Sequence, residues 1–428
     1  MRHTRARALL ALTAAAATAA VSACAHTPDA RQVGAGAAGN VPGTTYFSIS
    51  PGSGDTGAET ANGITVDAQN GGKITGVTVT TRGDKVTGTL SASGTEWHST
   101  WALNNATRYT VTADGTNAQG HPVTSTSTFT TQTPKSTFQT LIYEGYNQTY
   151  GVGMPIMLTF SQPVKDEAAV ERALTLTTSK PVIGAWYWDG DEKVYFRPRD
   201  YWPAGTTVSL DAHLNGLDAG DGVYGAEDLT QTFDIGQSVI AVASTTTHHT
   251  QVYVGGQLRY TWPISTGRTT MPTPDGTYLT VQKGNPVRMI GGKKGTPGYY
   301  NELVKFAVRF TFSGDYYHAA PWSVVSQGYS NVSHGCVNLS PADAQIYYQM
   351  AIPGDPVTIM SSPRGGVWDN GWTQWFYDWQ QYLAGSASHM AVEAGPDGSR
   401  LVSPSAVPPD TATAPLGTSS PANYQKAG

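Results

Sequence analysis

The sequence predicts a mainly β protein in which several domains follow one another. The chain has 428 residues, and 48 Gly and 26 Pro make turn-forming residues frequent. Short segments that alternate between apolar and polar residues recur between clusters of Gly, Asn and Asp, a pattern typical of half-buried strands. At about 100–200 residues per domain, this length predicts two to four domains.

The composition excludes two broad classes of protein. Charged residues make up 13% of the chain and the formal net charge is −5, whereas a nucleic-acid-binding protein needs a basic face. The 11 Trp and 22 Tyr are too many for a disordered chain. We therefore expect folded domains that do not bind nucleic acid.

Residues 1–23 are predicted to be a lipoprotein signal peptide. Met1–Arg7 carries three arginines, and Ala8–Val21 is an apolar run that is shorter than the ~20 residues of a membrane-spanning helix. The run ends in Val21-Ser22-Ala23-Cys24, which resembles a bacterial lipobox, so we expect lipidation of Cys24 and a membrane anchor. The alternative is an ordinary signal peptide with a cysteine nearby. Residues 24–43 are Ala/Gly-rich and are predicted to be a flexible tether.

Two units of about 100 residues follow, at residues 44–135 and 136–236. In the first, Tyr109–Ala113 and Thr126–Phe129 alternate with period two. In the second, one face of a strand carries Val208, Leu210, Ala212 and Leu214. Because helical pattern is scarce and each unit has the size of an immunoglobulin-like β-sandwich, we predict two such sandwiches in series.

The second unit contains two further features. Lys165–Leu174 is its one candidate helix. Asp218–Gly222 is an acidic, Gly-rich loop whose Asp218 and Asp221 offer oxygen ligands for calcium, although such loops are more often solvated turns.

Residues 237–362 are predicted to form a third, β-rich domain with one main helix. The expected strands are Ser238–Ala243, Thr250–Val254, Leu258–Ile264 and Val304–Phe312, with Gly255-Gly256 as a hairpin turn. The helix is predicted to start after Ser340, since serine is a favoured N-cap residue. Pro341 at the first helical position and Asp343 in the first turn support the same start.

The C-terminal region divides into two parts. Residues 363–384 are predicted to be a helical segment packed on the third domain, because its tryptophans have helical spacing; they are Trp368, Trp372, Trp375 and Trp379. Such a stripe can stack on sugar rings but is more often buried, and we expect packing. Residues 385–428 are Ser/Pro/Ala/Thr-rich and are predicted to be a disordered tail.

Cysteine usage directs attention to residue 336. The chain has two cysteines, and if Cys24 is lipidated, Cys336 has no partner, which suggests a reactive thiol in an exported protein. Because a thiol becomes a strong nucleophile only as thiolate, a nearby imidazole must draw the proton away. His318 and His334 are candidates for that base. Gly335 would let the backbone approach the substrate closely, and backbone N–H groups around Cys336 are candidates for stabilising an oxyanion.

Two other interpretations of this cluster compete. One is an inert, buried cysteine beside ordinary loop histidines. The other is a zinc site formed by His318, His334 and Cys336, but zinc ligand sets usually contain close pairs such as C-x₂-C, which are absent here. We therefore predict no metal and no cofactor.

The arrangement of these residues resembles the active-site signature of the L,D-transpeptidase (YkuD) family. Fourteen residues separate His318 from Ser333-His334-Gly335-Cys336, and Asn338 follows after one more residue. The resemblance extends over Ser238–Met360. The lipobox, the two sandwich units and the Trp-bearing segment resemble the multidomain actinobacterial members.

The resemblance implies a peptidoglycan cross-linking enzyme with a β-rich catalytic domain. Cys336 would attack the diaminopimelate carbonyl of a donor tetrapeptide stem, release D-alanine and form a thioester that an acceptor stem converts to a 3→3 cross-link. His318 matches the general base, His334 an aid beside the nucleophile, and Asn338 an orienting residue. The resemblance also implies covalent inhibition by carbapenem β-lactams and action in the cell wall at the outer face of the membrane.

Further residues match the family's substrate-binding positions. Besides Ser333, Gly335 and Asn338, they are Tyr300, Ser313, Gly314, Trp322 and Met289. Many relatives have Ser after the general-base histidine, whereas this chain has Ala319. Alanine serves equally if that position orients His318 through its backbone carbonyl, and holds it less firmly if a hydroxyl is needed.

Three other functions could be built on parts of this sequence. An L,D-carboxypeptidase would use the same thiol with water as acceptor. A non-catalytic wall-binding lipoprotein would rely on the sandwiches and the tryptophans. A sortase is rejected because its cysteine normally follows a Thr-Leu-x-Thr pattern, and here Asn331–His334 precedes the glycine and cysteine.

Overall fold

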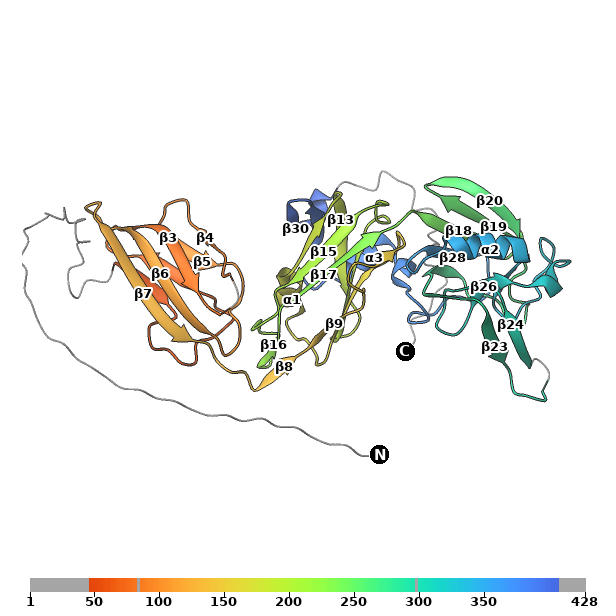
Figure 1. The fold of residues 1–428 in the computed structure, drawn as a ribbon, viewed down its shortest axis with the longest axis horizontal. Coiled ribbons are helices and arrows are strands. Elements are labelled where there is room, and N and C mark those ends of the chain that lie inside the picture. The colour runs from red at the N-terminus through yellow and green to blue at the C-terminus, as the bar shows by residue number, and fades with distance from the viewer. Residues whose placement is uncertain (1–45, 83–84, 297–298, 408–428) are drawn as a thin grey trace, which may run out of the picture.

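The computed structural model describes residues 46–82, 85–296 and 299–407. Three β-rich units follow one another, with the second between the other two (Figure 1), which confirms the mainly β prediction. Within the described residues, no helix is long and apolar enough to cross a membrane. The predicted signal peptide, Cys24 and the predicted tether lie outside the described residues.

The first unit is a sandwich of two antiparallel sheets, with strand orders β1-β2-β5-β4 and β3-β6-β7. The strands are β1 (Phe47–Ser50), β2 (Thr65–Ala68), β3 (Lys73–Thr80), β4 (Gly88–Leu90), β5 (Glu96–Ser99), β6 (Arg108–Thr116) and β7 (Pro122–Thr130). The predicted alternation in β6 and β7 is confirmed, because Tyr109 and Phe129 are buried and their rings stack 5.6 Å apart.

The second unit is also a two-sheet sandwich, with strand orders β10-β17-β15-β12 and β30-β29-β13-β14-β11-β9, beside a short β16-β8 ribbon. Its elements are β8 (Ser136–Phe138), β9 (Thr140–Ile142), β10 (Thr149–Tyr150), β11 (Ile156–Phe160), α1 (Glu167–Ala173), β12 (Leu174–Thr178), β13 (Val182–Trp188), β14 (Lys193–Pro198), β15 (Thr207–Ala212), β16 (Val223–Gly225) and β17 (Leu229–Ile235). The predicted helix is confirmed as α1, whose cap Asp166 accepts a hydrogen bond from Ala169 N.

Two strands of this sandwich come from the predicted disordered tail. β29 (Ala391–Gly395) pairs with β13 and with β30 (Gly398–Val402), and Val392 is buried in the sandwich core. The turn residues are Pro396 and Asp397, flanked by the paired Gly395 and Gly398, and Gly398 has φ 105°, a conformation that favours glycine. The prediction of disorder from residue 385 is therefore wrong for residues 391–402, and the predicted unit 136–236 lacks two of its strands.

The third unit contains two mixed sheets and a projecting hairpin (Figure 1). The five-stranded sheet has order β20-β19-β18-β28-β21, the four-stranded sheet order β22-β25-β26-β27, and β23 pairs with β24. The elements are β18 (Val239–Ser244), β19 (His249–Val254), β20 (Gln257–Pro263), β21 (Gly276–Leu279), β22 (Gln282–Gly284), β23 (Val287–Gly291), β24 (Tyr300–Val304), β25 (Ala307–Arg309), β26 (Tyr316–Ala319), η1 (Pro321–Ser323), β27 (Val337–Leu339), α2 (Pro341–Met350) and β28 (Pro356–Met360).

Most predicted elements of this unit are present. Ser340 caps α2 and its hydroxyl accepts a hydrogen bond from Asp343 N at 3.2 Å. The predicted strand Val304–Phe312 is instead two strands, because Phe306 has φ 53°, a left-handed conformation that interrupts a strand.

The four tryptophans of residues 363–384 do not share one helix. Only η2 (Gln374–Phe376) and α3 (Trp379–Ala384) are helical there. Asp369 and Gly371 have φ 69° and 133°, and such backbone cannot continue a right-handed helix. The helical expectation is therefore wrong for the first half of the segment.

The expectation that these tryptophans are packed is confirmed, since all four are at most 9% exposed. They lie between the second and third units: the Trp375 indole donates a hydrogen bond to Gly153 O at 2.7 Å, and the Trp368 indole donates to Asp189 at 3.1 Å. A short helix, η3 (Pro404–Ala406), ends the described chain.

Arg197 fastens this segment to the second sandwich. Its guanidinium lies 4.3 Å from the ring centroids of both Trp375 and Tyr382 and donates to Tyr377 O at 3.0 Å. Burial lowers its pKa to about 10, so it stays charged at neutral pH. Because the segment contacts both units, it fixes the third unit against the second.

Candidate active site

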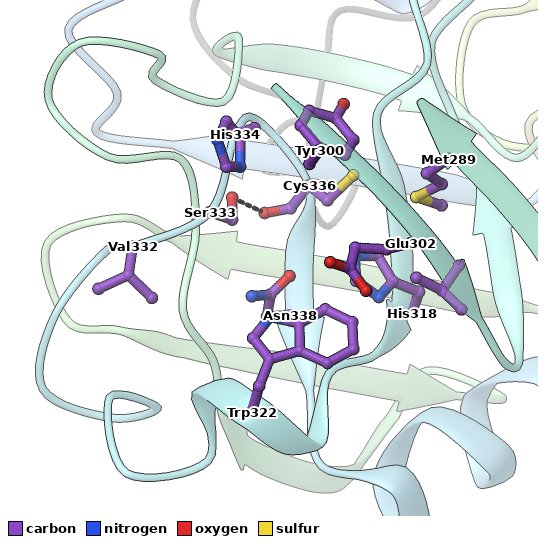
Figure 2. A pocket seen from close by; sticks show the side chains of 11 residues that line it. Met289, Tyr300, Glu302, His318, Trp322, Val332, Ser333, His334, Cys336 and Asn338 are labelled. Atoms are coloured by element: carbon purple, nitrogen blue, oxygen red, sulfur yellow. Dashed lines mark hydrogen bonds between the residues drawn. The ribbon is translucent and has the colours of Figure 1, made fainter. Parts of the chain in front are cut away.

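A cavity of about 240 Å³ opens beside the projecting hairpin, where β24, β26 and β27 meet (Figure 2). All three predicted catalytic residues line it, as do five of the predicted substrate-binding residues. The full lining is Met289, Tyr300, Glu302, Val304, His318, Trp322, Val332, Ser333, His334, Cys336 and Asn338. The sequence analysis missed Glu302, Val304 and Val332.

Parallel strand pairing brings the nucleophile and the base together. β26 and β27 are neighbours in register, with His318 opposite Asn338. Cys336 directly precedes β27, and residues two apart in an extended chain point to the same side. The cysteine, the histidine and the asparagine therefore face the same cavity.

His318 is positioned as a neutral base. The side chain is 3% exposed, and its Nδ1 lies 3.0 Å from Ala319 O. A carbonyl oxygen only accepts hydrogen bonds, so Nδ1 carries the proton and Nε2 has a free lone pair. Burial lowers the pKa of His318 to about 4. The backbone carbonyl of Ala319 thus orients the ring, which is the first of the two possibilities for this position.

The Cys336 thiol is protonated in the resting site. It is half-buried, and its Sγ donates a weak hydrogen bond to Gly314 O at 3.8 Å. Burial, together with the charge of Asp315, raises the pKa of the thiol to about 12. Both groups therefore favour their neutral forms at rest.

A tight turn presents the cysteine. The Ser333 hydroxyl donates to Cys336 O at 2.6 Å and accepts from Gly335 N at 3.1 Å. Gly335 has φ 133°, and a Cβ there would lie 2.3 Å from an Asp315 carboxylate oxygen. Only glycine fits this close approach. Ser333 and Gly335 thus shape the turn.

Asp315 is a buried carboxylate that the sequence analysis missed. It is 7% exposed, and its Oδ2 accepts hydrogen bonds from the hydroxyls of Thr311 at 2.8 Å and Ser313 at 3.3 Å. Burial raises its own pKa. The predicted Ser313 and Gly314 do not line the cavity: the serine holds this carboxylate, and the glycine carbonyl contacts the thiol.

The remaining walls differ in character. Asn338 donates from its amide to Ser323 Oγ at 3.1 Å, which fixes its orientation. Trp322 is 54% exposed at the rim, with its ring 6.1 Å from that of His318. Met289 packs in a small apolar cluster that Cys336 joins.

His334 lies apart from the base, stacked on Tyr300 with 4.6 Å between ring centroids (Figure 2). Partial burial and the positive charge of Arg268 lower its pKa. This placement fits a supporting role beside the nucleophile.

The described part of the chain contains no cluster of three or more His, Cys, Asp or Glu side chains arranged to hold a metal ion. In the acidic loop of the second unit, Asp218 Oδ1 accepts a hydrogen bond from Gly220 N at 2.8 Å.

Replacing Asp315 by Asn should make Cys336 more reactive. The change removes a negative charge beside the sulfur, so the pKa of the thiol should fall, and each unit of fall raises the thiolate fraction about tenfold. The rate of Cys336 alkylation by iodoacetamide at pH 8, followed by mass spectrometry of the Cys336 peptide, should rise several-fold. Asp343→Asn, in α2, is the matched control and should leave the rate unchanged. A slower reaction in Asp315→Asn would contradict the assigned role.

Burial of neutral His318 should make the third unit less stable in acid. Its folded pKa of about 4 lies below the ordinary value of ~6.5, so the unfolded chain binds more protons between these limits. The contribution of His318 to the free energy of unfolding is thus fully present above pH ~6.5. It is lost as the pH falls toward 4, which lowers the free energy of unfolding by about 3 kcal/mol.

Urea unfolding at pH 7 and pH 4.5 measures this loss. His318→Gln should lose that part of the pH dependence, whereas His121→Gln, on an exposed turn of the first unit, should retain it. If the free energy of unfolding depends on pH in the same way in His318→Gln and in the unsubstituted protein, the pKa of His318 is not lowered in the folded protein.

Comparison with known proteins identifies the chain. Residues 238–359 match the L,D-transpeptidase catalytic domain family, and residues 55–218 match the bacterial Ig domain family. L,D-transpeptidase 5 of Mycobacterium tuberculosis is 36% identical over 318 residues, which cover 71% of this chain and 69% of the relative. L,D-transpeptidase 2 of the same species is 34% identical over 340 residues, which cover 76% and 83%.

A solved structure of an L,D-transpeptidase in complex with imipenem is 36% identical, has a TM-score of 0.44, and covers 51% of this chain and 97% of that chain. Two relatives more than 30% identical are matched over at least two thirds of their length. The chain therefore belongs to the L,D-transpeptidase family, and its third unit is the catalytic domain of that family.

Proposed function

We propose that this L,D-transpeptidase joins the stem peptides of peptidoglycan through 3→3 cross-links between diaminopimelate residues. The observation that carries the proposal is that Cys336 and His318 line one cavity, with His318 Nδ1 held 3.0 Å from Ala319 O. Burial raises the pKa of the thiol and lowers that of the imidazole, so both groups favour their neutral forms. A neutral nucleophile and a neutral base suit acyl transfer, because the proton moves only when the sulfur attacks.

The first half-reaction acylates the enzyme. Cys336 Sγ attacks the carbonyl of the third residue of a donor tetrapeptide while its proton passes to His318 Nε2. The C–N bond to the terminal D-alanine then breaks, and His318 returns the proton to the leaving amine. The hydrogen bond from Nδ1 to Ala319 O keeps Nε2 free for both transfers. Tyr300, Trp322 and Met289 would contact the stem peptide.

The second half-reaction decides between two products. Attack on the thioester by the side-chain amine of a second diaminopimelate forms the cross-link and frees the thiol. Attack by water gives a tripeptide, which is the L,D-carboxypeptidase alternative. We favour the amine because this chain shares its family with named transpeptidases.

The proposal extends to location and to the other domains. The lipobox at Cys24 and the basic, apolar signal segment support a lipoprotein at the outer face of the membrane. The tether of residues 24–43 would set the reach. The sandwiches at 44–135 and 136–236, the latter completed by 391–402, would hold the catalytic domain of 237–362 away from the lipid.

Product analysis with a tetrapeptide donor tests the function. The purified protein should release D-alanine and form a cross-linked dimer in excess over tripeptide, because the thioester is resolved by an amine. Cys336→Ala should form neither product, whereas Cys24→Ser, which alters the other cysteine, should form both. Tripeptide without dimer would assign carboxypeptidase activity, and full function in Cys336→Ala would leave only a wall-binding role.

Carbapenems should acylate the same sulfur. Attack of Cys336 on the strained lactam carbonyl opens the ring, forms a thioester and transfers the thiol proton to the ring nitrogen. Intact-mass measurement should show one adduct equal to the mass of the whole carbapenem. The adduct should be absent in Cys336→Ser and present in Cys24→Ser. An adduct that persists in Cys336→Ser would refute the assignment.

A further inference from the structure

The acceptor half-reaction requires a group that binds an ammonium ion, and neither Cys336 nor His318 can do so. The side-chain amine of diaminopimelate lies on a carbon that also carries a carboxyl group, so it is an α-amino group, whose ordinary pKa is ~8, and most of it arrives as an ammonium ion at neutral pH. The thioester cannot be attacked until the ammonium has been bound and has lost a proton. At this stage Cys336 is held in the thioester and burial keeps His318 neutral, so neither offers a charge complementary to a cation.

Glu302 supplies such a charge at the right place. Among the residues that line the cavity, it is the only carboxylate. Tyr300, Glu302 and Val304 all line the same cavity, as expected for alternate positions on β24. Across the hairpin, Glu302 pairs with Met289, another cavity residue. Figure 2 shows Glu302 among the side chains that line this pocket, together with His318 and Asn338.

The Glu302 carboxylate has no competing partner within the described chain. The residue is exposed, and no hydrogen bond or ion pair joins it to another described side chain. Arg288 is the nearest cation in sequence, but it lies on β23 and donates to Asn301 Oδ1 at 2.9 Å. An exposed acid on a strand is often only a solvated charge, but this acid lines the same cavity as Cys336, whereas its neighbour Leu303 does not.

We propose that Glu302 binds the ammonium group of the acceptor stem and accepts its first proton, which makes it the acceptor-specificity residue of this enzyme. The inference rests on the proposed function and names the group that selects amine over water. The carboxylate takes one proton from R–NH₃⁺ and releases it to solvent. The resulting amine attacks the thioester carbonyl, passes its second proton to His318 Nε2, and that proton returns to the departing sulfur.

The test separates donor from acceptor. The donor is a tetrapeptide whose diaminopimelate side-chain amine is acetylated, so that it cannot act as acceptor. The acceptor is a tripeptide with a free amine, which lacks the D-alanine of a donor. Dimer and hydrolysed donor are measured with the purified protein as the acceptor concentration varies.

Glu302→Gln should raise the acceptor KM and lower the dimer-to-hydrolysis ratio at subsaturating acceptor, each about tenfold, an effect typical of losing one charge-assisted contact. Glu302→Asp should restore part of the ratio. Raising the salt concentration should lower the ratio in the unsubstituted protein more than in Glu302→Gln, because salt screens charges at an exposed site. Leu303→Gln, on the opposite face of β24, is the matched control and should retain the original ratio.

Two results would overturn the inference alone: an unchanged ratio in Glu302→Gln, or a change confined to the donor KM. If the unsubstituted protein hydrolyses the donor but forms no dimer at saturating acceptor, the proposed cross-linking function fails and the role of Glu302 fails with it.

Discussion

The parallel pairing of β26 with β27 is the constraint on which the catalytic geometry depends. It places His318 opposite Asn338 and sets Cys336 one residue before the ladder begins. The base and the nucleophile thus come from strands that hydrogen-bond directly, and a shift of one residue would turn the histidine into the core. The turn before β27 must also be tight, which Gly335 permits because a side chain there would strike Asp315.

Burial then decides the charge state of the site. His318 and Cys336 both lose hydration, and each therefore favours its neutral form. Asp315 adds a repulsive charge near the sulfur. A protonated thiol reacts slowly with oxidants and stray electrophiles. The thiol of such a site reacts mainly with a carbonyl that is already bound next to the imidazole.

The sequence predicted what depends on local pattern. The alternation in β6 and β15, the cap at Ser340 and the spacing of His318 from Cys336 are all written within short stretches of chain. The main residues of the cavity could be predicted because they belong to one long motif. A long motif is much more specific than single histidines or cysteines.

The residues that were missed owe their position to contacts between distant segments. Asp315 matters because the turn at Gly335 folds onto it, and Glu302 matters because β23 and β24 project beside β27. Glu302 lies two residues after Tyr300, and residues two apart in a strand share a face. A strand predicted at Tyr300 would therefore have placed Glu302 on the same face. The spacing of the tryptophans predicted one helix, which was wrong because Asp369 and Gly371 have positive φ and form a turn. These two turn-forming residues were a local signal against the helix. The turn at Pro396-Asp397 was not recognised because the residues around it are rich in Ser, Pro, Ala and Thr.

The return of the C-terminal hairpin to the second sandwich imposes an order on synthesis. During translation, β13 emerges long before its neighbour β29, and the whole catalytic domain is made between them. Until then, one side of β13 is an open sheet edge, a surface prone to pairing with other chains. A polypeptide interrupted after its catalytic residues would thus hold every group needed for chemistry and still lack the strands that close its middle domain.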